Sequence, residues 1–178
     1  MKKALIVVDM INDFCEPEGA MARSLATGIV YANSVVNNIK ERIHQHNGPV
    51  IWLCCGHENA GIQPSRYPIH AVKSSWGAEV ISSLKTDAQD PNSIVIHKPV
   101  CFNAFYKTGL GFFLHKIRID RAEVAGVRAS ESVLGVVHGL RTRNIPTSVP
   151  INCVADPDTS AERFALKQMK KLYGVKVI

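Results

Sequence analysis

Short runs of apolar residues recur along the chain and alternate with segments in which apolar and polar residues follow a helical spacing. The first run, residues 4–8, is continuous and rich in β-branched side chains, as is typical of a strand covered on both faces. Similar runs lie at 50–53, 94–96, 122–125, 147–154 and 175–178. We therefore predict a sheet of about six strands, which is close to the mean sheet size.

Helical patterns occupy most of the intervals between the predicted strands. Residues 27–46 repeat apolar side chains roughly every 3.6 residues, and Gly48 and Pro49 follow as stop signals. Further helices are expected at 76–84, 107–116, 132–140 and 158–172, with Ser130 as the N-cap of the helix at 132–140 and Asp158 starting the last. Strands that alternate with helices predict a doubly wound, three-layer α/β/α fold with a mostly parallel sheet.

Composition and charge narrow the possible functions. A chain of 178 residues fits a single domain over residues 1–178, and 46% hydrophobic with 20% charged residues is ordinary globular composition. The 21 Lys and Arg residues exceed the 15 Asp and Glu residues by six, but no basic run is longer than Lys170-Lys171, so nucleic-acid binding is not expected. No apolar stretch approaches the roughly 18 residues of a membrane span, and no GxGxxG follows the first strand, which argues against a dinucleotide site.

The cysteines point to a reducing compartment. Five occur, an odd number, and no two form a CxxC pair. The apolar run at 4–8 is too short for the hydrophobic region of a signal peptide, and Asp9 interrupts it. We therefore expect a reduced, cytoplasmic protein in which the cysteines are mostly small buried apolar residues.

Candidate chemistry follows the ends of the predicted strands, because ligands of a doubly wound sheet bind beyond the carboxyl ends of its strands. Asp9 ends the first strand and Lys98 follows the third. Such a pair can move a proton at neutral pH, or it can be a structural ion pair. Ser132 lies at the start of the predicted helix 132–140, where backbone N–H groups favour a nucleophile or an oxyanion, although a serine there is also a common helix cap.

Four segments, in order, resemble the isochorismatase-like cysteine hydrolases, and nicotinamidases in particular. Residues 4–18 read ALIVVDMINDFCEPE and residues 67–79 read YPIHAVKSSWGAE. Residues 97–99 and 103–105 read HKP and NAF, and residues 124–127 read VAGV. The resemblance implies a small-amide hydrolase, with nicotinamide as the first candidate substrate and a homo-oligomer as the expected state.

The resemblance also implies roles for individual residues. Asp9 would be the general base, residue 132 the nucleophile, and Lys98 the third member of the catalytic triad. Phe14 and Trp76 would line the substrate pocket. Val127 and Arg128 would border it and would be joined by a non-proline cis peptide bond.

The nucleophile position departs from the family pattern. The family segment runs GVATDxCV, whereas residues 126–133 read GVRASESV and place Ser132 where the cysteine belongs. A thiol has a pKa of about 8.5, but a serine hydroxyl ionises far less readily and usually needs a histidine base. Ser132 is therefore an engineered substitution, a natural loss of activity or a serine-using variant. The alternative function is a catalytically inactive small-molecule-binding or interaction protein on the same scaffold.

A second departure concerns metal. Nicotinamidases resemble one another in an Asp-x-His and a later His that bind zinc or a similar ion, and here the corresponding residues are Cys55, His57 and His70. These three side chains could hold zinc or another divalent metal, with Glu58 as a replacement oxygen ligand. The missing aspartate could equally mean that no metal binds, and the proposed chemistry itself requires no cofactor.

Overall fold

The fold is built on one parallel sheet. The computed structural model describes residues 2–24, 33–58 and 67–178. The strands are β1 (Lys3–Val8), β2 (Val50–Cys55), β3 (Ser93–Lys98), β4 (Arg121–Val127), β5 (Thr147–Val149), β6 (Val154–Ala155) and β7 (Lys176–Val177). They lie in the order β3-β2-β1-β4-β5-β7, and β6 pairs with β4. The named pairings are all parallel, which confirms the doubly wound fold, with seven strands where about six were predicted.

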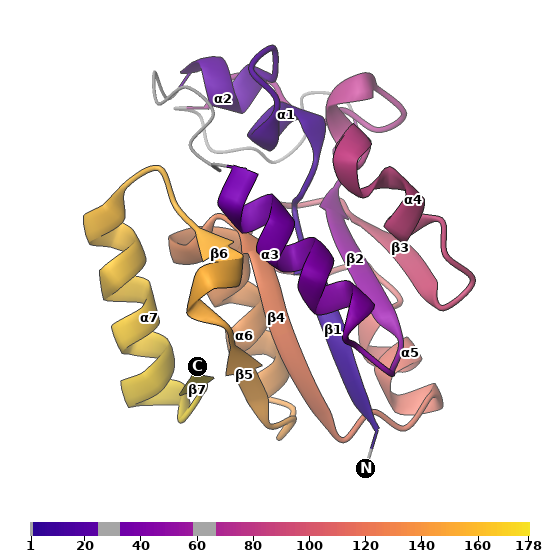
Figure 1. Ribbon diagram of the computed structural model, residues 1–178, viewed down its shortest axis with the longest axis vertical. Coiled ribbons are helices and arrows are strands. Elements are labelled where there is room, and N and C mark those ends of the chain that lie inside the picture. The colour runs from indigo at the N-terminus through magenta and orange to yellow at the C-terminus, as the bar shows by residue number, and fades with distance from the viewer. Residues whose placement is uncertain (1, 25–32, 59–66) are drawn as a thin grey trace.

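Helices cover both faces of the sheet. They are α1 (Asn12–Cys15), α2 (Ala20–Ser24), α3 (Asn33–His44), α4 (Lys85–Ala88), α5 (Leu110–Lys116), α6 (Leu134–Arg141) and α7 (Thr159–Tyr173). In Figure 1, α3 crosses the front of the sheet while α5 and α6 lie behind it. None of the helices in the described ranges is both long enough and apolar enough to span a bilayer.

The continuous apolar run of β1 is explained by these two layers. Leu5 and Val7 belong to the buried cluster that includes Ile39 of α3. Ile6, on the opposite face, belongs to the cluster that includes Leu114 of α5. Because successive side chains of a strand point to opposite faces, β1 needs apolar residues at every position. Full burial of each such side chain contributes about 1.5–3 kcal/mol.

The strand predicted at 147–154 is wrong as a single element. It divides into β5 and β6, separated by a 3-10 turn over Ile151–Cys153. Pro150 at the break has no N–H to donate to a neighbouring strand. The division lets β5 pair with the first part of β4 and β6 with its last part, where Val154 lies opposite Gly126.

Two predicted helices need correction. The helix expected at 27–46 is described only as α3, Asn33–His44, and residues 27–32 lie outside the described residues. The helix expected at 76–84 is wrong, because the structure has two 3-10 turns, Trp76–Ala78 and Ser82–Leu84. Between them Val80 forms a bridge with Ile11, and this extended pairing replaces the helical hydrogen bonds.

The predicted helix at 158–172 is confirmed, together with its start signal at Asp158 and its stop signal at Gly174. It is α7, and the Asp158 side chain accepts hydrogen bonds from the amides of Ser160 and Ala161 at 2.8 and 3.1 Å. Gly174 ends it in the left-handed conformation, with φ 62°.

Ser130 is not the N-cap predicted for the helix at 132–140. Residues Ala129–Val133 form a π-helical turn, and α6 follows it directly. The amide and hydroxyl of Ser130 donate to Asp156 Oδ2 at 2.9 and 2.6 Å. Ser132 therefore lies inside a turn that is tied to the end of β6.

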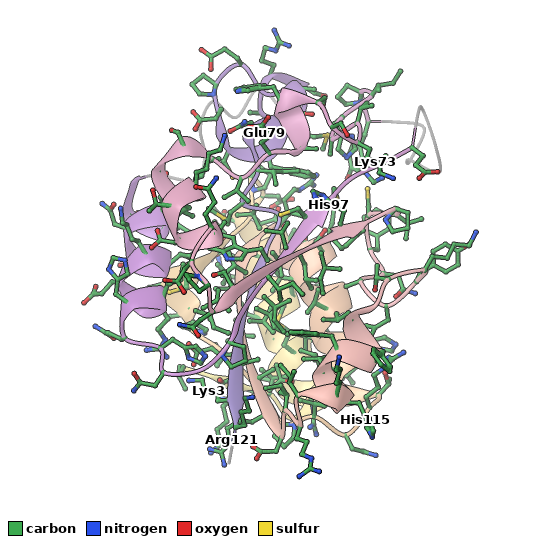
Figure 2. The ribbon with its side chains drawn as sticks, turned by 90° about the vertical axis from the view of Figure 1, so that its right-hand side faces the viewer. Lys3, Lys73, Glu79, His97, His115 and Arg121 are labelled. Atoms are coloured by element: carbon green, nitrogen blue, oxygen red, sulfur yellow. The ribbon has the colours of Figure 1, made fainter. Side chains whose placement is uncertain are left out.

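The two ends of the sheet carry different side chains. Figure 2 shows Lys3 and Arg121 together at one end, where β1 and β4 begin in register. Lys73, Glu79 and His97 lie toward the opposite end, where the parallel strands finish. The candidate chemistry lies at this carboxyl edge.

Candidate active site

The three predicted catalytic residues meet where the strand order reverses. β2 and β3 lie on one side of β1, and β4 lies on the other, so the carboxyl ends of β1 and β4 border the switch point of the sheet. Asp9 directly follows β1, Lys98 is the last residue of β3, and Ser132 follows β4 in the π-helical turn. The topology therefore brings together residues that are far apart in sequence.

The Lys98 ammonium contacts the other residues of this site. Its side chain is 0% exposed, and its Nζ donates to Asp9 Oδ2 at 2.8 Å and to the Cys101 carbonyl at 3.0 Å. The same nitrogen lies 3.3 Å from Cys55 Sγ and 3.4 Å from Ser132 Oγ. Burial alone would lower the pKa of Lys98, but Asp9 and Cys55 together outweigh burial and raise it. Lys98 is therefore an ammonium that forms a buried ion pair with Asp9.

Asp9 is held in an unusual backbone conformation. Its φ is 50°, in the left-handed region that side chains other than glycine and a few polar residues rarely occupy. Its amide still donates to the Leu53 carbonyl at 2.8 Å, and its Oδ1 accepts from the Cys55 amide at 2.8 Å. Such strain persists where the surrounding structure enforces it, and here it coincides with the buried ion pair.

The residues expected to line the substrate pocket differ in how far they are buried. Phe14 is buried and packs edge-on against His70, with ring centroids 5.4 Å apart. Trp76 is 49% exposed, and its carbonyl accepts a hydrogen bond from the Asn12 side chain at 2.7 Å. Val127 and Arg128 are buried and are joined by a cis peptide bond. Their contact with a substrate stays a prediction.

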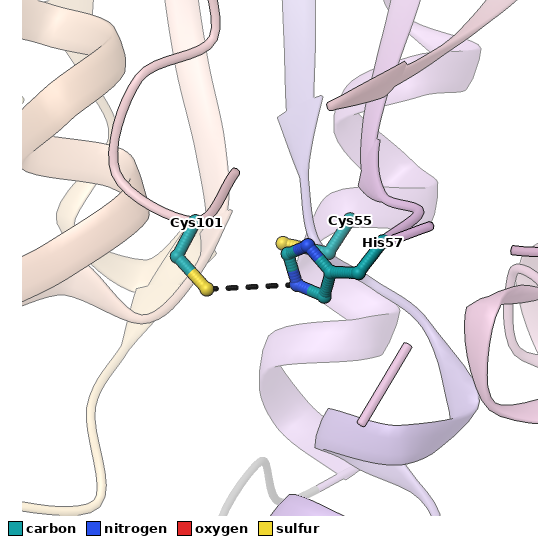
Figure 3. A group of neighbouring side chains, drawn as sticks. All are labelled: Cys55, His57 and Cys101. Carbon is teal, nitrogen blue, oxygen red and sulfur yellow. Dashed lines mark hydrogen bonds between the residues drawn. The ribbon is translucent and has the colours of Figure 1, made fainter. Parts of the chain in front are cut away.

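A second buried group lies beside Lys98. Cys55, His57 and Cys101 each present a ligand atom, and these atoms lie within 4.8 Å of one another (Figure 3). Cys101 Sγ lies 3.6 Å from His57 Nε2 and 3.8 Å from His70 Nε2. The Nδ1 atoms of His57 and His70 lie 3.0 and 2.8 Å from the carbonyls of Pro99 and Pro68. Hydrogen bonds to these carbonyls place the proton on Nδ1 and leave each Nε2 lone pair facing Cys101.

Sequence reasoning missed Cys101 as a member of this group. Its one signal in the sequence is its position three residues after Lys98. At this spacing the Cys101 carbonyl accepts from Lys98 Nζ. A hydrogen bond from the Cys101 thiol, with smaller contributions from the Lys98 ammonium and His57, lowers the pKa of Cys55 to about 6. Glu58, expected as a replacement ligand, is exposed and pairs with Lys73 at 3.1 Å instead.

The other three cysteines are inert by their surroundings. Cys15, Cys54 and Cys153 are free and buried. Burial raises the pKa of Cys15 and Cys54, and it raises the pKa of Cys153 to about 11. They remain protonated and act as small apolar residues, as expected.

The fold and site together are a doubly wound parallel α/β sheet with a buried Asp–Lys pair at its switch point. The chain matches the isochorismatase domain over residues 3–178 and belongs to that family of hydrolases. This confirms the resemblance drawn from the four sequence segments.

Three relatives illustrate the relationship. A probable inactive nicotinamidase of Arabidopsis thaliana is 30% identical over 142 residues, which are 73% of this chain and 68% of the relative. The crystal structure of a pyrazinamidase/nicotinamidase from Streptococcus mutans has a TM-score of 0.86 at 22% identity, covering 99% of this chain and 100% of the other. The pyrazinamidase of Pyrococcus horikoshii in complex with zinc also has a TM-score of 0.86 at 22% identity, covering 100% and 99%. At these identities the two solved structures show a common fold.

Proposed function

We propose that residues 1–178 form a single domain with the active site of a small-amide hydrolase, in which Asp9, Lys98 and Ser132 are the catalytic residues. The observation that carries this proposal is the position of Lys98 Nζ, which is 2.8 Å from Asp9 Oδ2 and 3.4 Å from Ser132 Oγ in a buried site. A buried ion pair that also contacts a hydroxyl at the switch point is better explained by chemistry than by stability, because buried ion pairs are weak stabilising elements.

The proposed reaction is acyl transfer. Asp9 accepts the proton of the residue-132 nucleophile, which attacks the amide carbonyl, and backbone amides near residues 128 and 132 stabilise the oxyanion. The proton then passes from Asp9 to the leaving nitrogen, and ammonia departs. Water, deprotonated by Asp9, hydrolyses the acyl-enzyme and releases the acid and the nucleophile. Lys98 remains charged throughout and holds Asp9 in place.

Ser132 weakens this machinery. A hydroxyl is far harder to deprotonate than a thiol, and an Asp–Lys pair is a poor substitute for the histidine that serine hydrolases use. We therefore expect this chain to be impaired as a hydrolase. The Arabidopsis relative, named as a probable inactive nicotinamidase, favours the second candidate, a binding protein that retains the site without turnover.

We also propose a metal beside the catalytic residues. Cys55, His57 and Cys101, with His70 alongside, would hold zinc or another divalent ion. The fit rests on the two histidines, whose Nδ1 atoms face backbone carbonyls while both Nε2 atoms converge on Cys101. When bound, such an ion supplies positive charge and a Lewis acid for an oxygen or nitrogen of the substrate. The zinc named for the Pyrococcus horikoshii pyrazinamidase supports this proposal.

The test is ammonia release from a panel of small amides, nicotinamide included, by the chain and by Ser132→Cys. We expect Ser132→Cys to increase turnover about tenfold or more, which corresponds to about 1.4 kcal/mol of activation free energy. Ser132→Ala is the matched control and should be no more active than the chain itself. Asp9→Asn in the Ser132→Cys background should abolish the gain.

The outcomes separate the two candidate functions. Turnover by Ser132→Cys that depends on Asp9 supports the hydrolase. Amides that bind but are not hydrolysed by either form would contradict the hydrolase and support a binding protein on the same scaffold.

A further inference from the structure

Arg128 is a buried cation, and two of its nitrogens have no acceptor among the described residues. The residue is 8% exposed, and its Nη2 pairs with Glu131 Oε1 at 2.9 Å. Over the described ranges 2–24, 33–58 and 67–178, Nε and Nη1 of this guanidinium are buried and have no hydrogen-bond partner. Leaving a buried charged donor unsatisfied is costly, so the two nitrogens require an acceptor that the described residues do not supply.

Side-chain contacts connect the guanidinium to the proposed active site. Arg128 stands four residues before Ser132, at the end of β4 and the start of the π-helical turn. Its Cζ lies 5.3 Å from the ring centroid of Tyr67, and the Tyr67 ring packs edge-on against His70 at 6.4 Å. His70 in turn contacts Phe14 and Cys101. A continuous chain of side-chain contacts therefore joins Arg128 to the Cys–His group beside Lys98.

The two carboxylates near Arg128 already have other donors, and neither accepts from Nε or Nη1. Glu131 accepts from Nη2 and also from the Tyr67 hydroxyl, so its carboxylate is already shared between two donors. Asp156 is satisfied by Ser130 and by the amide of Asp158 at 3.2 Å. Neither carboxylate reaches Nε or Nη1. A guanidinium presents five N–H donors, and a ligand carboxylate can accept from Nε or Nη1.

We propose that Arg128 binds a carboxylate of the substrate, so that the natural ligand is an acidic amide, a molecule with one carboxamide for residue 132 and one carboxylate for Arg128. This inference rests on the proposed function, because it deepens the specificity of the same site. It separates this chain from a site built for a neutral amide, in which Nε and Nη1 of the guanidinium would have no anionic partner among the described residues.

The test uses pairs of probes that differ only in charge. They are 3-carbamoylbenzoate against benzene-1,3-dicarboxamide, and succinamate against succinamide, with dissociation constants measured by calorimetry on the full chain. A charge-assisted hydrogen bond in a buried site predicts that at least one carboxylate binds about tenfold or more tightly than its neutral partner. Arg128→Gln should remove this preference.

Two further variants distinguish recognition from a structural ion pair. Arg163→Gln removes the same charge from an exposed site on α7 and should keep the carboxylate preference. Glu131→Gln removes the competing carboxylate while Arg128 remains, and should keep or increase the preference. If Arg128 were only the partner of Glu131, both Arg128→Gln and Glu131→Gln would lower the unfolding midpoint and neither would change the preference.

The inference is overturned if the carboxylates bind no better than their neutral partners, if Arg128→Gln keeps the preference, or if none of the four probes binds. Failure of the proposed function is a separate result, seen as absence of ammonia release by Ser132→Cys. Turnover of neutral amides without any carboxylate preference would keep the hydrolase and reject the role of Arg128.

Discussion

Glu123 is a buried carboxylate away from the candidate active site, and its side chain links three elements of the fold. It lies in β4, accepts from Lys3 of β1 at 2.7 Å and pairs with Arg42 of α3. Ser148 of β5 donates to it as well, at 3.4 Å. Burial alone would raise the pKa of Glu123, but the hydrogen bonds from Arg42 and Lys3 outweigh burial and lower it.

Glu123→Gln should therefore destabilise the protein by about 2 kcal/mol at pH 7, since it leaves two cations facing a neutral group. Because the folded pKa lies below the unfolded value of about 4.3, the stabilisation is present above that pH and is lost as the pH falls through the folded pKa. Denaturant unfolding between pH 7 and 3 would show a difference between the two proteins that narrows in acid. The exposed pair of Glu79 with Lys85 provides a control, and Glu79→Gln should change stability by less than about 0.5 kcal/mol. A constant difference at every pH would contradict the assignment to Glu123.

At the same scale, some site residues could be predicted and others could not. Asp9 and Lys98 follow apolar strands, and the rule for parallel sheets places them at one edge, where the structure has them 2.8 Å apart. Cys101 could not be predicted as a neighbour of His57, because its place depends on the path of the backbone after β3 and not on any local pattern. The unpaired nitrogens of Arg128 likewise depend on the direction of a side chain, which no spacing encodes.

Between elements, β4 approaches β1 closely beside the candidate site. Gly126 has a φ of 115°, and a Cβ at this position would overlap the carbonyl and amide of Val8, one residue before Asp9. Gly126→Ala should cost about 3 kcal/mol or more, because strain at a glycine-type φ adds to overpacking in the sheet. It should also displace Asp9 from Lys98.

Thermal unfolding of Gly126→Ala and Gly109→Ala side by side would test this. Gly109 has a φ of −79°, and nothing lies within 4 Å of an added Cβ, so alanine there should be neutral or slightly stabilising. Equal unfolding midpoints for the two variants would show that the contact between β4 and β1 can relax.

Element boundaries show what periodicity can and cannot predict. α7 was predictable because its cap, its spacing and its terminal glycine agree. The segment 76–84 has helical spacing, but the bridge between Ile11 and Val80 is a contact across the chain that spacing cannot reveal. The division of the predicted strand 147–154 could have been predicted from Pro150, because a proline cannot donate a hydrogen bond to a neighbouring strand.

For the molecule as a whole, the parallel order of the sheet was predictable because alternating strands and helices leave few topologies. The same order brings together Cys55 and His57 at the end of β2 and Cys101 after β3. A metal held there would therefore join two segments that separate on unfolding. Binding to the folded state alone stabilises it by about 2.7 kcal/mol when the free metal is at 100 times its dissociation constant.

Zinc added to chelator-treated, dialysed protein should thus raise the unfolding midpoint by about 5–10 °C, as expected for a chain of this size. Cys101→Ser should lose most of this shift, because the thiolate is a far better zinc ligand than a hydroxyl. Cys153→Ser makes the same chemical change at a buried thiol outside the group and should keep the full shift. Calorimetry would record the midpoints, and mass spectrometry of the dialysed protein would count bound metal. Unchanged midpoints together with no retained zinc would reject the metal and leave Cys55, His57 and Cys101 as a hydrogen-bonded wall of the substrate site.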